Sequence, residues 1–186
     1  CGAGKGVNDL LGIWLGTGVG GGLILRGELY TGHFHSAGEI GHVTLIPNAA
    51  FGSRSLEQNC SRTSVARRLE FLIKANNPSM ITELTGGDLG EIKSKVIAKA
   101  YEAGDKLTHA VVDDVAHLVG VAAASAVTLL SLPRVVIGGG LTEALGEAFV
   151  SRIRHSCRAA AFPPKAKAVD VVASKLEDNA GVIGSA

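Results

Sequence analysis

The order of hydrophobic and polar residues predicts strands at the start of the chain. Residues 10–15 form a short apolar run that ends at a glycine-rich segment, as a strand before a turn would. The apolar residues 23–25, the pair Arg26-Gly27 and residues 28–30 then have the pattern of a β-hairpin with a tight turn. Residues 43–46 predict one more strand, which Pro47 stops.

Helical spacing of apolar residues appears in three segments after this region. The segment 63–77 places four apolar residues on one face, and Ser or Thr can cap it. A second helix is predicted to begin at Asp88, because Asp88 and Glu91 have capping-box spacing. A third, long helix carries apolar residues from 111 to 130, and its alanines and Gly120 allow a neighbouring element to approach closely.

The last third of the chain predicts a strand, three glycines and a helix. Pro133 ends the long helix, and residues 134–155 follow as this strand-glycine-helix unit. A final strand at 166–174 precedes a helix of small residues at 177–186. A hairpin first, then helices, then strand and helix, is the order of an α/β domain with a mixed sheet flanked by helices.

The glycine-rich segment after residue 15 contains the pattern G-x-G-x-x-G at Gly16, Gly18 and Gly21. A dinucleotide-binding loop needs a helix directly after the glycines, and here a second strand follows. Glycines in a hairpin turn still let the backbone approach a phosphate anion, and Thr17 adds a hydroxyl donor. The alternative for this segment alone is a tight hairpin whose glycines satisfy only turn geometry.

Glycines 138–140, by contrast, do lie between a predicted strand and a predicted helix. They are therefore the better candidates for contact with a nucleotide at a helix N-terminus, where unpaired amides and the helix dipole favour phosphate.

Composition and charge limit the classes of protein that the chain can belong to. With 186 residues and 46% hydrophobic residues it can bury the core of one domain, 1–186. A formal net charge of +1 gives no basic surface of the kind that nucleic-acid binding requires. Three widely spaced cysteines favour a reducing compartment, and hence the cytoplasm. The apolar run 118–132 is interrupted and too short for a membrane span.

Candidate chemistry gathers at three side chains in the first third of the chain. Glu39 and His42 are three residues apart between glycines, so both could be aimed into one cleft; an exposed Glu and a structural His are the alternative. Glu57 begins a helical region, where a capping role would otherwise be expected. His33 and His35 do not complete a strong metal-ligand pattern with His42, so no metal site is predicted.

Five segments, taken in order, resemble the ROK family of bacterial sugar kinases and sugar-responsive repressors. They are "LGTGVGGGLILRGELYTG", "AGEIGH", "LE" at 56–57, "PRVVIGGGL" and "DNAGVIGSA". The resemblance covers nearly the whole chain and implies a lobe of the actin-like ATPase (ribonuclease H-like) fold.

The resemblance also implies roles for individual residues. The ATP phosphates would be contacted by the first turn, and the adenosine and phosphates by the second glycine segment; these positions are Gly16, Thr17, Gly18, Gly20, Gly138, Gly139, Gly140 and Leu141. Glu39, His42 and Glu57 match the sugar-contacting positions, where carboxylates and an imidazole bind vicinal hydroxyls. The implied reaction is ATP-dependent phosphorylation of glucose or a related hexose, with Mg²⁺ on the phosphates.

Two departures from the family pattern qualify these expectations. The positions of three zinc-binding cysteines hold Asn48, Ala50 and Ser55 here, so a structural zinc is not expected. The family's N-terminal lobe, with the aspartate that acts as catalytic base, would lie before Cys1. We therefore expect the chain to be a C-terminal lobe that holds no catalytic base and is inactive alone.

Three functions remain open at this point. A hexose kinase is the leading hypothesis; a sugar-sensing repressor of the same family, or a scaffold that has lost the chemistry, are the alternatives. The resemblance also implies a homodimer formed through this lobe. The net charge and the short apolar run predict no nucleic acid or membrane as its partner.

Overall fold

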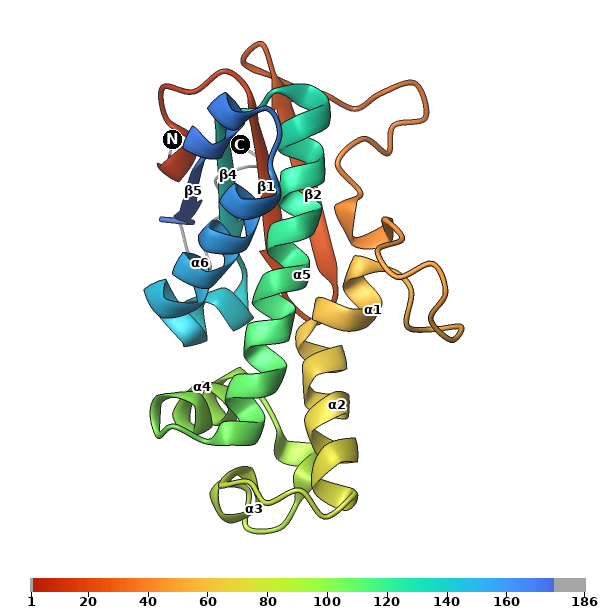
Figure 1. Ribbon diagram of the computed structural model, residues 1–186, viewed down its shortest axis with the longest axis vertical. Coiled ribbons are helices and arrows are strands. Elements are labelled where there is room, and N and C mark those ends of the chain that lie inside the picture. The colour runs from red at the N-terminus through yellow and green to blue at the C-terminus, as the bar shows by residue number, and fades with distance from the viewer. Residues whose placement is uncertain (1, 176–186) are drawn as a thin grey trace.

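The computed structural model describes residues 2–175 and contains a five-stranded mixed sheet (Figure 1). The strands are β1 (Leu10–Leu15), β2 (Val19–Leu25), β3 (Glu28–Leu29), β4 (Arg134–Gly138) and β5 (Asp170–Ala173), in the spatial order β3-β2-β1-β4-β5. The central strand β1 is antiparallel to β2 and parallel to β4. The predicted hairpin and mixed sheet are both confirmed.

Two long helices lie side by side across one face of this sheet (Figure 1). The helices are α1 (Leu56–Cys60), α2 (Arg62–Lys74), α3 (Ile81–Leu84), α4 (Ser94–Glu102), α5 (Lys106–Leu130) and α6 (Gly140–Ala160). The two long helices are α5 and α6, and the shorter helices α2, α3 and α4 lie beyond the ends of the strands (Figure 1). The predicted long helix is α5, and it packs closely on α6. A methyl group at Gly120 would lie only 2.5 Å from Ser156 Cβ, so the prediction of a close neighbour is confirmed.

The core forms where alternate residues of β1 meet these helices. Leu11, Ile13 and Leu15 point to the same side of the sheet, and none is more than 3% exposed. Trp14 lies on the opposite side, where its indole ring covers Gly12 and Gly138. Burying three aliphatic side chains fixes the register of β1 and hence the position at which its turn begins.

Three local predictions need correction or lie beyond what is described. Residues 43–46 do not form a strand, because only Thr44 bridges to Ser55 and no ladder continues from it. Asp88 caps a 3₁₀ turn, Leu89–Glu91, rather than an α-helix. The extended backbone at Ile92 ends this turn, and α4 begins only at Ser94. The small-residue helix predicted at 177–186 lies outside the described residues.

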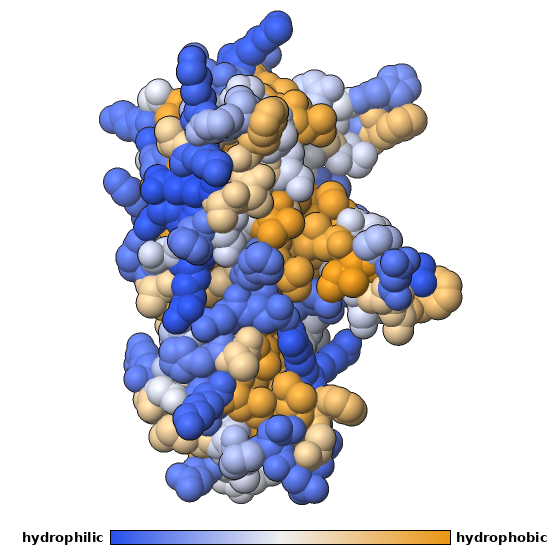
Figure 2. Space-filling model, viewed as in Figure 1, coloured by the Kyte–Doolittle hydropathy of each residue, from blue (hydrophilic) through white to orange (hydrophobic). Residues whose placement is uncertain are grey.

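Helix α5 is longer than the interrupted apolar run at 118–132, and by length and composition, unlike that run, it could cross a membrane. Just over half of its most apolar window, 56%, is buried inside the protein, as in the core helix of a folded domain. Apolar side chains continue on its exposed side along a groove of about 420 Å³ between α5, β2 and residues 36–43 (Figure 2). Leu129 borders this groove and is 83% exposed.

Candidate functional site

A cleft of about 440 Å³ opens at the end of the sheet where β1 turns into β2. Its wall consists of Trp14, Gly16, Thr17, Gly18, Val19, Gly20, Glu39, His42, Glu57 and Gly139. The three candidate sugar contacts and the first glycine turn, which are separate in sequence, therefore share one cavity. Gly139 adds the second glycine segment, because β4 is the parallel neighbour of β1 and both strands end here.

The glycine turn between β1 and β2 points its carbonyls into the protein. The carbonyls of Gly16 and Thr17 accept hydrogen bonds from the Arg62 N–H (2.8 Å) and the Thr63 hydroxyl (2.9 Å) at the start of α2. The Gly18 carbonyl accepts one from the Gly16 N–H at 2.9 Å. Within residues 2–175, the N–H groups of Thr17 and Gly18 have no hydrogen-bond partner. Two amides are thus left for an anion, whereas the Gly16 amide is already used.

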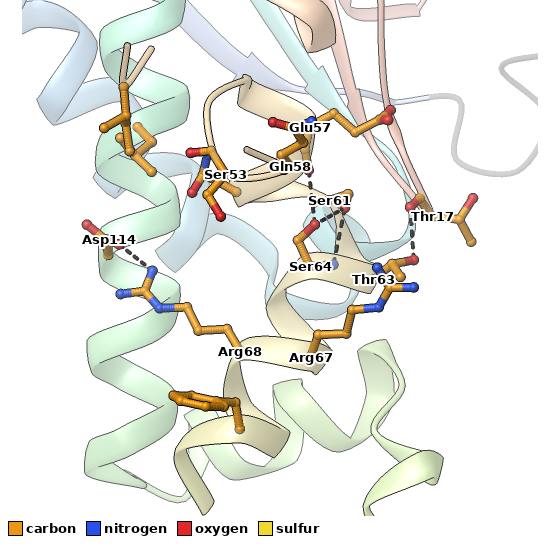
Figure 3. A pocket seen from close by; sticks show the side chains of 15 residues that line it. Thr17, Ser53, Glu57, Gln58, Ser61, Thr63, Ser64, Arg67, Arg68 and Asp114 are labelled. Carbon is orange, nitrogen blue, oxygen red and sulfur yellow. Dashed lines mark hydrogen bonds and ion pairs between the residues drawn. The ribbon is translucent and has the colours of Figure 1, made fainter. Parts of the chain in front are cut away.

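Glu57 reaches this turn from the first turn of α1, which Ser55 caps. Its Oε2 accepts a hydrogen bond from the Val19 N–H at 2.8 Å. Ser55 and Gln58 form a complete capping box, so α1 does not need Glu57 as its cap. The side chain extends from α1 toward the end of the β1–β2 hairpin (Figure 3).

Glu39 and His42 lie at the two ends of a 3₁₀ turn, Ile40–His42, that packs on β2. The distance from His42 Nε2 to Glu39 Oε2 is 3.9 Å, and both side chains are more than half exposed. The turn approaches β2 closely, since a methyl group at Gly21 would lie 2.3 Å from the Gly38 carbonyl oxygen. Gly21 therefore serves this contact between segments, and the two polar side chains remain open to a ligand.

The second glycine segment contributes to the cleft mainly through Gly139. Gly138 packs under the Trp14 ring, and the Leu141 side chain is 1% exposed in the core. Gly139 and Gly140 begin α6, and Gly139 has no side chain to cap it. Gly140 and Leu141 can therefore meet a ligand only through the backbone amides of the first helical turn.

A larger cavity of about 700 Å³ lies beside the first, on the α2 side of the glycine turn, and shares Thr17 and Glu57 with it (Figure 3). Arg68 forms an ion pair with Asp114 of α5, which ties α2 to α5. Arg67 extends toward Thr63 and Thr17, and has no ion pair with another described residue (Figure 3). Hydroxyls and the Arg67 guanidinium therefore border the turn on this side, together with the Glu57 carboxylate.

The cysteine nearest the site has an unreactive thiol. Cys60 is fully buried on α1, and burial, with a smaller effect from Asp114, raises the pKa of its thiol to about 12. Such a thiol stays protonated at neutral pH and supplies neither a nucleophile nor a metal ligand. Residues 2–175 contain no group of three or more His, Cys, Asp or Glu side chains arranged to hold a metal ion.

Three residues of this region escaped the sequence analysis. Trp14 lines the cleft, Val19 binds Glu57, and Thr63 anchors the turn. Trp14 could have been found from the alternation in β1, because it is the large side chain on the face opposite the core. The other two have no local signal, since their partners are 38 and 46 residues away.

The chain is similar to several known proteins along its whole length. A glucokinase of Halalkalibacterium halodurans is 34% identical over 98% of this chain, and one of Thermotoga maritima is 32% identical over all of it. A solved ROK family glucokinase from Streptomyces griseus, in complex with glucose and AMPPNP, superposes with a TM-score of 0.87 at 29% identity. That comparison covers 99% of this chain and 61% of the solved one.

The relatives are longer than this sequence. The chain spans 56% of the Halalkalibacterium protein and 59% of the Thermotoga protein. A xylose repressor of Caldicellulosiruptor bescii is more distant, at 26% identity over 96% of the chain. The family description "ROK family" matches residues 1–186, from the first to the last residue. The fold expected from the resemblance is thereby confirmed, and the chain belongs to the ROK family.

Proposed function

We propose that the protein carrying this chain is a sugar kinase that transfers the γ-phosphoryl group of ATP to a hydroxyl of glucose or a related hexose. The cleft carries this proposal, because it places two carboxylates and an imidazole beside a turn with two unpaired amides. The relatives named glucokinase, and the Streptomyces griseus structure with glucose and AMPPNP, support the same reading.

The residues of the cleft divide between the two substrates. Glu39, His42 and Glu57 bind sugar hydroxyls, since carboxylates accept and an imidazole can accept or donate hydrogen bonds. The N–H groups of Thr17 and Gly18 bind phosphate oxygens, and Gly16 and Gly20 leave room for their approach. The adenosine side of the nucleotide lies along the start of α6, at Gly138, Gly139, Gly140 and Leu141.

The remaining chemistry comes from outside this chain. We place the catalytic base, an aspartate, in an N-terminal lobe that closes over the cleft and excludes water. Mg²⁺ enters with the ATP phosphates, which is its usual mode of binding in kinases, and no structural zinc is held. Ser55 caps α1 instead of ligating metal. One lobe lacks both closure and base, so the isolated chain is expected to show no turnover.

The surface of α5 is consistent with association of this lobe. The groove beside β2 is mainly apolar, and Leu129 and Leu130 on α5 both border it. Exposed apolar patches of this kind mark surfaces that other protein covers. We propose a homodimer formed through this lobe in the cytoplasm, with no membrane or nucleic acid bound to it.

A sugar-sensing repressor is the second candidate, because the xylose repressor matches nearly the whole chain. The same cleft would then bind a sugar without phosphorylating it, and the DNA-binding helices would lie in another part of the protein. The two candidates differ in whether the glycine turn between β1 and β2 binds the phosphates of ATP.

A coupled ADP-release assay on the full-length protein distinguishes them, with Mg-ATP and a panel of hexoses and N-acyl hexosamines. We expect activity in the full-length protein and none in the 186-residue chain. Sugar binding without ADP release would overturn the kinase and favour the repressor. Absence of both sugar binding and ADP release would favour the scaffold.

A further inference from the structure

We infer that Glu57 has a role beyond its proposed sugar contact: it sets the shape of the glycine turn that receives the phosphates, and so couples the two substrate sites. This inference rests on the proposed function, because it assumes that a sugar and a nucleotide share the cleft. Glu57 would then make two contacts, one with the sugar and one with the glycine turn, which lies in a separate sequence motif.

The contact between Glu57 and the turn is direct and close. Oε2 accepts the Val19 N–H at 2.8 Å, at the residue where β2 begins. The same oxygen would lie 2.5 Å from a methyl group at Gly18, and the three nearest described atoms outside the adjoining residues all belong to Glu57. Glycine at this position is therefore what allows the carboxylate to reach the Val19 amide.

Glu57 completes a set of three hydrogen bonds that hold the turn from α1 and the start of α2. The Arg62 N–H and the Thr63 hydroxyl bind the carbonyls of Gly16 and Thr17, on one side of the turn. Glu57 binds the Val19 N–H that follows the turn. Between these contacts the Thr17 and Gly18 amides stay unpaired, so the three bonds fix the direction in which they point.

The effect of Glu57 on the nucleotide must be geometric rather than electrostatic. A carboxylate repels a phosphate, so its charge alone weakens nucleotide binding. Its value lies in the acceptor oxygen that orders the turn before the phosphates arrive. A glutamine keeps an acceptor at this place and lacks the charge, and so separates these two effects.

Sugar binding reinforces this order. The hydrogen bond to Val19 uses Oε2, and Oε1 has no hydrogen-bond partner within the described part of the chain. A sugar hydroxyl that donates to Oε1 restricts the rotation of the Glu57 side chain. The turn that Glu57 holds then loses less conformational entropy when the nucleotide binds. Binding of the sugar then tightens binding of the nucleotide, and the coupling is reciprocal.

Glu39 supplies the matched control. It is the other carboxylate of the cleft and a proposed sugar contact, but it shows no hydrogen bond to the glycine turn among the described residues. If Glu57 acts on the sugar alone, alanine at either position should have the same consequence for the nucleotide. If Glu57 shapes the turn, the two variants must differ.

The test measures the dissociation constant of AMPPNP and of glucose separately, by calorimetry on the full-length protein, for wild type, Glu57→Ala, Glu57→Gln and Glu39→Ala. We expect Glu57→Ala to weaken AMPPNP binding without sugar about tenfold, the upper value of one ordinary hydrogen bond. Glu57→Gln and Glu39→Ala should stay within about twofold of wild type for AMPPNP. In wild type, glucose should tighten AMPPNP binding, and this effect should vanish in Glu57→Ala.

A second pair of variants keeps the test decisive if Glu57→Ala unfolds. Gly18→Ala should weaken AMPPNP binding as Glu57→Ala does, and the double variant should lose no more than either alone, because the methyl meets only Glu57. Gly22→Ala is the control, in the strand β2 that follows the turn, since no described atom outside the adjoining residues lies within 4 Å of its methyl position.

The outcomes separate the inference from the proposed function. Wild type that binds no AMPPNP overturns the kinase, and the inference with it. Wild type that binds both ligands, with Glu57→Ala equal to Glu39→Ala for AMPPNP, overturns the inference alone. Glu57→Gln as weak as Glu57→Ala, or additive losses in the double variant, also overturns it, because the effect would then not come from the acceptor contact with the turn.

Discussion

The two glycine segments of the cleft look alike in sequence but are constrained by different neighbours. Each follows the end of a strand, and these strands, β1 and β4, are adjacent in the sheet. At Gly18 the nearest group that a side chain would meet, among the described residues beyond its two chain neighbours, is the carboxylate of Glu57, which comes from another element. At Gly139 the limit is the backbone of Leu15 itself. The first segment is therefore constrained by a side chain that can move, whereas the second is constrained by the backbone of the sheet.

The largest expected effect is at Gly139. An alanine there would put a methyl group 2.7 Å from the backbone N and O of Leu15, at a φ of 91° that side chains rarely adopt. We expect Gly139→Ala to lower the free energy of unfolding by about 3 kcal/mol, measured by urea denaturation. A loss below about 1 kcal/mol would show that the second segment is as adjustable as the first.

A smaller effect is expected from loosening the first segment. Thr63→Val keeps the shape of the side chain and removes the hydroxyl that binds the Thr17 carbonyl at 2.9 Å. This exposed bond should contribute at most about 1 kcal/mol to stability, and its loss should weaken AMPPNP binding about threefold. Thr82→Val, in α3, is the control, because its hydroxyl has no hydrogen bond among the described residues. Equal nucleotide affinity in both variants would argue against Thr63 as an anchor of the turn.

The smallest effect sharpens the comparison within the second segment. Gly140 is the next residue after Gly139, yet no described atom outside its own helical turn and adjoining residues lies within 4 Å of its methyl position, and it already lies in α6. Gly140→Ala should raise the free energy of unfolding by about 0.5 kcal/mol, because alanine favours a helix over glycine. If urea denaturation instead shows a lower free energy of unfolding for Gly140→Ala, the backbone constraint at Gly139 would extend to Gly140 as well.

Much of the fold follows from local pattern. The alternation and apolar runs of β1, β2 and β4 and the stripe of α5 predict these elements because burial of one face decides each of them. The predictions that failed, the strand at 43–46 and the helix start at Asp88, concern segments whose residues are mostly exposed, although Leu45 and Leu89 are partly buried against the core. A strand there would have needed a partner beyond Ser55, and sequence spacing does not show whether one exists.

For the site, the sequence predicts the residue types better than the contacts. Glu39, His42, Glu57 and both glycine segments do meet at one cleft. The bond from Val19 to Glu57 was not predictable, because it joins two segments that only the packing of α1 against β2 brings together. The same holds for Gly21, which looks like a ligand-binding glycine and instead allows residues 38–41 to approach the strand.

The central place of β1 has a consequence for how the chain folds. Its partner β2 begins at Val19, directly after the turn, whereas its other partner β4 begins only at Arg134. The hairpin closes a short loop, but the β1–β4 pair must close a very long one, which costs more chain entropy and is slower. We therefore expect the glycine turn between β1 and β2 to form early as a local structure. Its final shape should form only after α1 and α2, which hold it by hydrogen bonds, have packed against the sheet.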